Sequence, residues 1–257
     1  MIGALESHLR ALRDAGRKLL VTYMTGGFSD EWCDVVRAMA DAGADAIEIG
    51  IPFSDPVIDG PTIQEASQRA LDRGATPVNI LEETCHLDVD VPLIVMTYYN
   101  LAFHAGHERF ASSLAASGIA GCILPDLSLE EARPWCAAAD AAGVATVLLA
   151  APTAPDDRLP RICARSRGFV YGVGLLGITG ERAALAASAR TMARRLKAVT
   201  DLPVLIGVGV SNAEQAAEVC EVADGAVVGS AILRRLLDGG SVDDIAAFVR
   251  DMRRALD

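Results

Sequence analysis

The stretch IEIGIPFSDPVIDGPTIQ, residues 47–64, is typical of a buried strand followed by a loop and the first turn of a helix. Side chains alternate between the two faces of a strand, so Glu48 points away from the face that carries Ile47 and Ile49. Pro61 suits the first position of a helix, where its missing N–H is not needed. The stretch therefore predicts one strand–helix unit with a carboxylate on the inner face of its strand.

The same unit recurs along the whole chain. Short β-branched runs alternate with Ala-rich helical stretches, a pattern typical of a parallel sheet. We expect strands at residues 18–24, 45–50, 92–98, 121–126, 145–150, 168–174, 203–209 and 225–229. Eight such units in 257 residues predict an α/β fold, a (β/α)8 TIM barrel forming a single domain over residues 1–257. An amphipathic N-terminal capping helix, at about residues 3–14, would cover the bottom of the barrel.

An open, doubly wound sheet is the alternative fold. We disfavour it because no G-x-G-x-x-G follows the first expected strand.

Composition narrows the class of protein. Hydrophobic residues make up 51% of the chain, enough for a large core, and the formal net charge of −11 argues against nucleic acid or an anionic membrane as partner. The N-terminal segment lacks the apolar core of a signal peptide, and no apolar stretch has transmembrane length. We therefore expect a soluble, cytoplasmic protein. The six cysteines form no C-x-x-C pair, which favours buried free thiols over disulfides or a metal cluster.

Two acids suggest proton-transfer chemistry. Glu48 lies near the end of its strand, where catalytic groups of such barrels occur, and burial would raise its pKa enough for it to donate a proton near neutral pH. Asp59 lies eleven residues later, on the loop above that strand end. The alternatives are a structural Glu48 bonded to neighbouring groups and an Asp59 that caps the next helix. Asp55 is expected to be a turn residue.

Three glycine-rich loops predict a phosphate site. GLLGITGERAAL (residues 174–185), GVGVS (207–211) and GSAILRRLL (229–237) follow the sixth, seventh and eighth expected strands. Glycines let backbone N–H groups approach an anion, and the N-terminus of a helix attracts negative charge. Loops at these positions often bind phosphate in this fold.

Other residue types exclude competing reactions. The two lysines, Lys18 and Lys197, fall away from the expected catalytic end, which argues against a Schiff-base aldolase. No histidine falls at the C-terminal end of a strand, and we expect His104 and His107 to be solvated on outer helices. A metal enzyme is therefore disfavoured. Proton transfer by carboxylates on a phosphorylated substrate remains.

Six motifs in this order resemble the tryptophan synthase alpha chain family. They are residues 47–64, MTYYNLAF (96–103), GCILPDLSLEE (121–131), LLAAPTAP (148–155), GITG (177–180) and VVGSAI (227–232). The resemblance covers nearly the whole chain. It implies cleavage of indole-3-glycerol phosphate to indole and glyceraldehyde 3-phosphate, in tryptophan biosynthesis and without a cofactor.

The resemblance also implies roles for individual residues. Glu48 matches the general acid/base, Asp59 the carboxylate that binds the indole N–H, and Tyr171 a tyrosine near Glu48. Thr179 matches a threonine that bonds the aspartate. The expected indole pocket comprises Tyr23, Met96, Tyr98 and Ile123, with Val208 where an aromatic ring is common. The expected phosphate cradle comprises Gly180, Gly209, Gly229 and Ser230.

A tryptophan synthase beta chain, in an α2β2 assembly, is the partner that the resemblance implies. Leu175 and Leu176 stand where the family usually has a polar, charged segment, and we expect them to favour closure of that loop without a partner. Two alternatives stay open. One is a stand-alone indole-3-glycerol phosphate lyase that releases free indole, and the other is a catalytically weak paralogue that binds phosphate ligands and regulates a partner. The presence of both Glu48 and Asp59 argues against the second.

Overall fold

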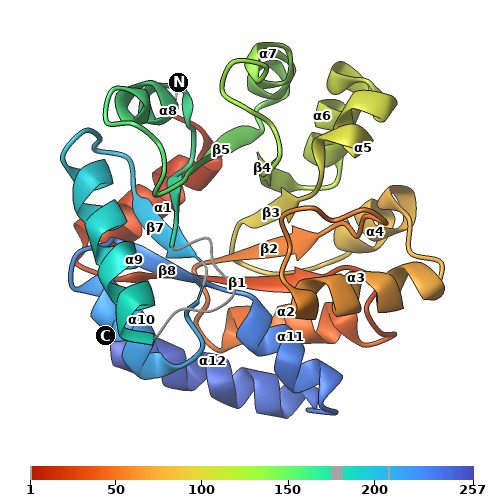
Figure 1. Cartoon of the computed structure of the whole chain (residues 1–257). Helices are drawn as coiled ribbons and strands as arrows, with labels where there is room; N and C mark the ends of the chain where they lie inside the picture. Colours follow the sequence, from red (N-terminus) through yellow and green to blue (C-terminus); the bar gives the residue numbers. More distant parts are fainter. Residues whose placement is uncertain (1, 175–181, 208) are drawn as a thin grey trace.

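The computed structural model describes residues 2–174, 182–207 and 209–257. In these ranges the strands form one closed parallel barrel, and Figure 1 shows the helices arranged around it. The strands are β1 (Leu19–Thr25), β2 (Ala46–Gly50), β3 (Leu93–Met96), β4 (Ile119–Ile123), β5 (Ala145–Ala150), β6 (Val170–Val173), β7 (Val204–Gly207) and β8 (Gly225–Val228).

The helices of the described ranges fill the connections and the two ends of the chain. They are α1 (Ala4–Asp14), α2 (Trp32–Asp41), α3 (Pro61–Asp72), α4 (Pro77–Thr84), α5 (Tyr99–Ala105), α6 (His107–Ala116), α7 (Arg133–Ala142), α8 (Arg158–Arg165), α9 (Arg182–Lys197), α10 (Ala213–Cys220), α11 (Ser230–Leu237) and α12 (Val242–Leu256).

Each strand pairs in parallel with the next one along the chain, and β8 closes the barrel on β1. The register places Tyr23 opposite Glu48 and Leu19 opposite Gly225. The predicted (β/α)8 fold is confirmed, and the doubly wound alternative is wrong because the sheet has no open edge. Strand β4 begins at Ile119, two residues before the predicted start, because the turn at Gly118 (φ 76°) already completes the preceding connection.

The alternation of side chains builds two cores. Leu19, Val21 and Ala46 face the inside of the barrel, whereas Ile47 and Ile49 pack outside against the helices. The predicted capping helix is α1, whose Leu5 and Leu9 belong to the inner core. This helix approaches closely because one position within β4 and one just before β6 lack a side chain. A Cβ would lie 2.8 Å from Leu5 Cδ2 at Gly121 and 2.7 Å from it at Gly168.

A buried carboxylate, Asp45, joins four segments at the bottom of the barrel. Its Oδ2 accepts from the Leu20 N–H (2.8 Å) and from Arg253 of α12 (3.0 Å), and its Oδ1 accepts from Arg17 (2.7 Å). His8 of α1 hydrogen-bonds the Asp45 carbonyl oxygen at 3.0 Å. A buried ion needs such partners to offset its loss of hydration, so α1, β1, β2 and α12 are held together at this one residue.

Candidate active site

Glu48 lies on β2 with its side chain 1% exposed. Its strand neighbours Ile47 and Ile49 belong to the outer core, and Ala46, two residues before it, belongs to the inner core, so the carboxyl group points into the barrel as predicted. Among the described residues its Oε1 has no hydrogen-bond partner, which contradicts the alternative of a fully bonded structural glutamate. Desolvation by burial raises the pKa of Glu48 to about 8. The group is therefore mostly protonated at neutral pH.

Two buried tyrosines share the upper part of the barrel with Glu48. The hydroxyl of Tyr23 accepts a long hydrogen bond from Thr25 Oγ1 (3.4 Å) and occupies the space where Gly50 would carry a Cβ. The hydroxyl of Tyr171 fills the corresponding space at Gly207 on β7. Burial raises the pKa of both phenols above the ordinary value, and Glu48 acts in the same direction on each. Both phenols are therefore neutral at ordinary pH.

We expect Gly207→Ala to displace Tyr171. A Cβ at this position would overlap the phenol ring and hydroxyl, and overpacking of this kind costs about 1–3 kcal/mol. The variant should unfold at lower denaturant concentration than the native chain, because Tyr171 has to leave its place beside Glu48. Gly3→Ala is the control, because a Cβ there has no neighbour within 4 Å. Equal behaviour of the two variants would contradict the packing argument.

Asp59 is half-buried above the end of β2. The helix-cap interpretation is wrong, because α3 begins at Pro61 and Gly60 is its N-cap. The Asp59 carboxyl group instead accepts a hydrogen bond from the Tyr98 hydroxyl, 3.1 Å from its Oδ2. Burial raises the pKa of Asp59, and the bond from Tyr98 opposes this shift. Asp59 and Tyr98 thus form one unit at the mouth of the barrel.

A small pocket lies over the C-terminal ends of β1 to β4. The predicted residues Tyr23, Asp59, Met96 and Tyr98 line it. Ile123 is instead fully buried in the inner core, and Pro125, two residues beyond the end of β4, lines the pocket. The other lining residues, which sequence reasoning missed, are Ile51, Phe53, Ser67 and Thr97. Phe53 could have been found, because an aromatic residue in a polar turn needs a packing partner. That partner is Tyr98, with ring centroids 5.2 Å apart.

The expected phosphate cradle is described in part. Gly209 has φ 91°, a conformation that favours glycine, and Gly229 is the N-cap of α11, whose first residue is Ser230. The first N–H groups of a helix have no intrahelical acceptor and can bind an anion. The remaining expected residues of this end lie outside the described ranges: Leu175, Leu176, Thr179, Gly180 and Val208.

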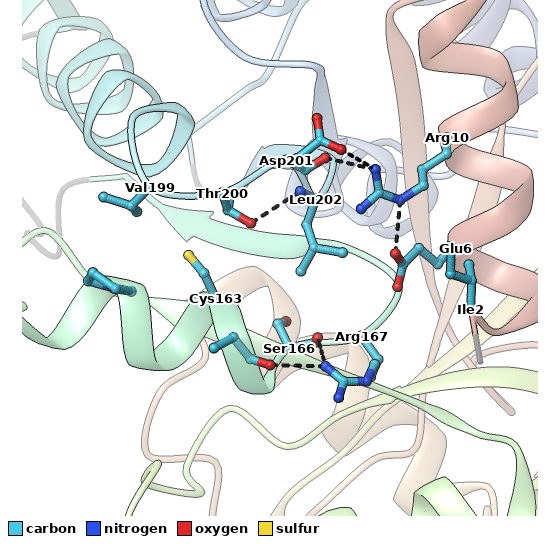
Figure 2. A pocket seen from close by; sticks show the side chains of 12 residues that line it. Ile2, Glu6, Arg10, Cys163, Ser166, Arg167, Val199, Thr200, Asp201 and Leu202 are labelled. Atoms are coloured by element: carbon cyan, nitrogen blue, oxygen red, sulfur yellow. Dashed lines mark hydrogen bonds and ion pairs between the residues drawn. The ribbon is translucent and has the colours of Figure 1, made fainter.

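A larger pocket, of about 570 Å³, lies at the opposite end of the barrel. Figure 2 shows Arg10 of α1 between Glu6 and Asp201, with Nε–Oε1 and NH1–Oδ2 distances of 2.8 and 2.6 Å. These charges pair with one another. Lys18 and Lys197 also lie at this bottom end, where they bond the Ala223 carbonyl and Asp224. Because barrel chemistry takes place at the C-terminal ends of strands, we assign this pocket no catalytic role.

The structure tests the predictions made for Asp55, His104 and His107. Asp55 is exposed and accepts from the Ser54 hydroxyl, as a turn residue does. His104 is exposed as predicted, but His107 is half-buried: its Nε2 lies 3.0 Å from the Tyr99 hydroxyl, and its ring packs edge-on to Trp135. The prediction for His107 was wrong because α7 covers α6.

The cysteines and the longer helices add two findings. All six cysteines are free, and four are buried, but Cys33 is half-buried and Cys85 is exposed, contrary to the expectation of buried thiols. In the described part of the chain, no helix combines the length and the apolar character needed to cross a membrane.

Comparisons with known proteins agree with this geometry. A family model described as tryptophan synthase alpha chain matches residues 9–254. The chain is 45% identical to the tryptophan synthase alpha chain of Thermobifida fusca, over 98% of this chain and 96% of the relative. It is 42% identical to that of Streptomyces coelicolor, with the same coverage of both chains.

Solved structures also resemble this chain over its full length. Mycobacterium tuberculosis tryptophan synthase superposes with a TM-score of 0.92 at 34% identity, covering 100% of this chain and 99% of the other. The alpha chain of Legionella pneumophila superposes with a TM-score of 0.90 at 28% identity, covering 100% and 98%. Full-length similarity in sequence and fold, together with the family-model match, shows that this chain belongs to the tryptophan synthase alpha chain family, a family of lyases.

Proposed function

We propose that this chain cleaves indole-3-glycerol phosphate to indole and glyceraldehyde 3-phosphate, as an alpha chain in tryptophan biosynthesis. The observation that carries the proposal is Glu48, a buried carboxyl group with a pKa of about 8 at the end of β2, below a pocket whose wall carries a second carboxyl group, Asp59. Two acids in different environments suit a reaction that needs a proton donor and a fixed negative charge.

In the proposed reaction Glu48 acts twice, as acid and then as base, and Asp59 acts once. Protonated Glu48 gives its proton to indole C3, and the ionised carboxyl group of Asp59 stabilises the positive charge that develops on the indole nitrogen. Glu48, now a carboxylate, takes the proton of the adjacent glycerol hydroxyl. The C3–glycerol bond then breaks, its electron pair restores the indole ring, and the hydroxyl carbon becomes the aldehyde of glyceraldehyde 3-phosphate. Atoms and charges balance without a cofactor.

The substrate's other groups have candidate binding places in the described residues. We assign the indole ring to the pocket lined by Tyr23, Met96 and Tyr98, which has to widen to admit it because its volume in this structure is only about 10 Å³. The phosphate suits the start of α11 at Gly229 and Ser230, where backbone N–H groups and the helix dipole favour an anion without any lysine.

The direct test is an assay of the purified chain with indole-3-glycerol phosphate. Indole and glyceraldehyde 3-phosphate should appear in equal amounts, and the rate should not change after dialysis against a chelator. Tight binding of the substrate without product formation would instead support the regulatory paralogue.

The rate should fall at alkaline pH because the first step requires protonated Glu48. A carboxyl group with a raised pKa holds its proton below that pKa and loses it above. We therefore expect kcat/KM, which reports the ionisation of the free enzyme, to decline about tenfold per pH unit above about pH 8, the pKa of Glu48. A pH–rate profile from pH 6 to pH 10 with a stability control at each pH checks this. A rate that stays flat to pH 10 would contradict the role of Glu48 as acid.

We also propose a tryptophan synthase beta chain as partner. Two observations support it: a matching solved structure is that of Mycobacterium tuberculosis tryptophan synthase, and the segments that follow β2 and β3 carry exposed apolar side chains. Val57 is 82% exposed and Phe103 is 63% exposed, although large apolar side chains usually avoid water. A contact there would place the partner beside the pocket.

Steady-state kinetics with and without the cognate beta chain tests this partner. Stimulation of the cleavage rate by about a hundredfold or more would support an ordinary alpha chain, whereas little stimulation would favour a stand-alone lyase, the alternative that Leu175 and Leu176 suggest. A factor of one hundred corresponds to about 2.7 kcal/mol of coupling. Val57→Asp should weaken the association and reduce the stimulation without changing the rate of the isolated chain.

A further inference from the structure

The Tyr98 hydroxyl lies at the centre of three hydrogen bonds to the segment that carries Asp59. It accepts from the N–H groups of Ile58 (3.0 Å) and Asp59 (3.2 Å), and it donates to Asp59 Oδ2 (3.1 Å). Tyr98 itself is buried, is the N-cap residue of α5, and stacks on Phe53. One oxygen atom therefore fixes both the backbone and the side chain of Asp59.

This arrangement leaves Oδ1, the other oxygen of the Asp59 carboxylate, to accept a hydrogen bond from a ligand. A carboxylate has two oxygens, and in the described part of the chain Tyr98 is the side chain that donates to the Asp59 carboxyl group, through Oδ2. Asp59 lines the pocket, so Oδ1 is available to a donor that enters it. Fixing one oxygen removes the rotational freedom of the group and holds the other in one direction.

A second contact fastens the same segment from the other side. The Gln64 amide on α3 donates to the Asp59 carbonyl oxygen at 2.8 Å and approaches the Pro56 carbonyl oxygen at 3.5 Å. Gln64 is exposed, and within the described ranges its amide nitrogen donates only to these two backbone carbonyl oxygens. It can stabilise the course of residues 56–59, but it has no contact with the Asp59 carboxyl group.

We propose that Tyr98 is a positioning residue that orients Asp59, so that Oδ2 is held by the protein and Oδ1 is presented to the N–H group of an indole ring. The proposal rests on the proposed function for the identity of the substrate. It assigns Tyr98 a role distinct from that of a pocket wall, because the hydroxyl, and not the ring, performs it.

The test is Tyr98→Phe, which removes one oxygen and keeps the ring that stacks on Phe53. We expect kcat to fall about tenfold or more, with a smaller change in KM. The oriented Asp59 carboxylate stabilises the transition state more than it stabilises the bound substrate, and this difference is lost when the carboxylate is misoriented. The matched control is Tyr99→Phe, the same change one residue later, whose hydroxyl contacts His107 away from the pocket. That variant should retain normal kinetics.

The pH profile separates positioning from a general structural role. The bond from Tyr98 favours the ionised form of Asp59 and lowers its pKa, so its removal should move the acidic limb of kcat/KM to higher pH. The titratable groups whose charge state is linked to Asp59 are Tyr23, Tyr98 and Tyr171, and Glu48 acts on Tyr23 and Tyr171. All four are neutral where Asp59 titrates, because the phenols ionise at high pH and Glu48 is protonated below about pH 8. A shift of this limb therefore reports on Tyr98 alone.

Two further measurements do not depend on catalysis. Amide exchange at Ile58 and Asp59 should be about tenfold slower in the native chain than in Tyr98→Phe, and a carboxyl-carbon titration of Asp59 should show a higher pKa in the variant. Gln64→Leu should increase amide exchange without moving that pKa. Unprotected amides in the native chain, or an unchanged acidic limb and Asp59 pKa in a folded Tyr98→Phe, would overturn the proposal. Absence of cleavage by the native chain, with these two measurements as expected, would reject only the proposed function.

Discussion

Glu48→Gln should lower kcat for indole-3-glycerol phosphate by at least about 10²-fold, the scale of general acid catalysis. Glutamine has the same shape but holds no transferable proton, and Glu48 is the buried acid that the proposed reaction uses twice. KM should change little, because the phosphate and the indole ring are bound by other groups. Steady-state kinetics at pH 7 checks both parameters.

The same variant should be more stable than the native chain at alkaline pH. The pKa of Glu48 is raised from 4.5 to about 8, so the folded state binds more protons than the unfolded state between these pH values and loses stability as the pH rises through them. At about 1.4 kcal/mol per pKa unit, ionised Glu48 costs the folded state up to about 5 kcal/mol above pH 8. Glutamine avoids this cost.

Denaturant unfolding at pH 5 and at pH 9 measures the effect. The two proteins should differ little at pH 5, where Glu48 is protonated when folded, and the variant should be the more stable at pH 9. Glu108→Gln, an exposed change on α6, should alter neither activity nor stability. Near-normal turnover of Glu48→Gln would refute the catalytic assignment, and equal stability at pH 9 would refute the buried, unpaired carboxyl group.

Asp59→Asn should also lower kcat strongly, by about 10²–10³-fold, while leaving the fold intact. Removing one group that stabilises developing charge typically has this effect. The amide oxygen of asparagine can still accept from Tyr98, and Gly60 remains the N-cap of α3, so the loop keeps its contacts. Only the negative charge is lost.

A nearby acid provides the matched control for this charge. Asp55 lies in the same loop, is exposed and bonds Ser54, so Asp55→Asn should leave the activity of the isolated chain unchanged. Kinetics of both variants, with circular dichroism to confirm folding, distinguishes them. Comparable activity of Asp59→Asn and the native chain would show that the Asp59 charge has no part in the reaction.

The sequence was sufficient to predict the strands and the direction of Glu48, because both depend on local alternation. Period-two patterning determines which face of a strand a residue occupies, so Glu48 was correctly placed inside the barrel. It does not determine how high a residue lies along the barrel axis, which depends on strand tilt and stagger. Ile123, expected to line the indole pocket, faces the inside of the barrel but lies in the inner core below the pocket-lining residues.

Contacts between distant segments could not be predicted in the same way. Tyr98 and Asp59 are 39 residues apart and meet only because β2 and β3 are neighbours in the closed barrel. Because the sequence does not reveal that contact, Asp59, which precedes Gly60 and Pro61, could be interpreted as a helix cap. His107 was misjudged for the same reason, since its burial depends on the packing of α7 against α6.

The Asp45 contact has a consequence for biosynthesis. Asp45 and Arg253 are 208 residues apart, so Asp45 leaves the ribosome long before the arginine of α12 that shares its carboxylate. Joining such distant groups costs about 5 kcal/mol of chain entropy, which the nascent chain cannot recover until the last turns of α12 have formed. In a ribosome-bound intermediate Asp45 could pair with Arg17, but it would lack Arg253, the buried one of its two cation partners. Chains released early, before Arg253 is added, should therefore be recognised by cellular proteases as unfolded.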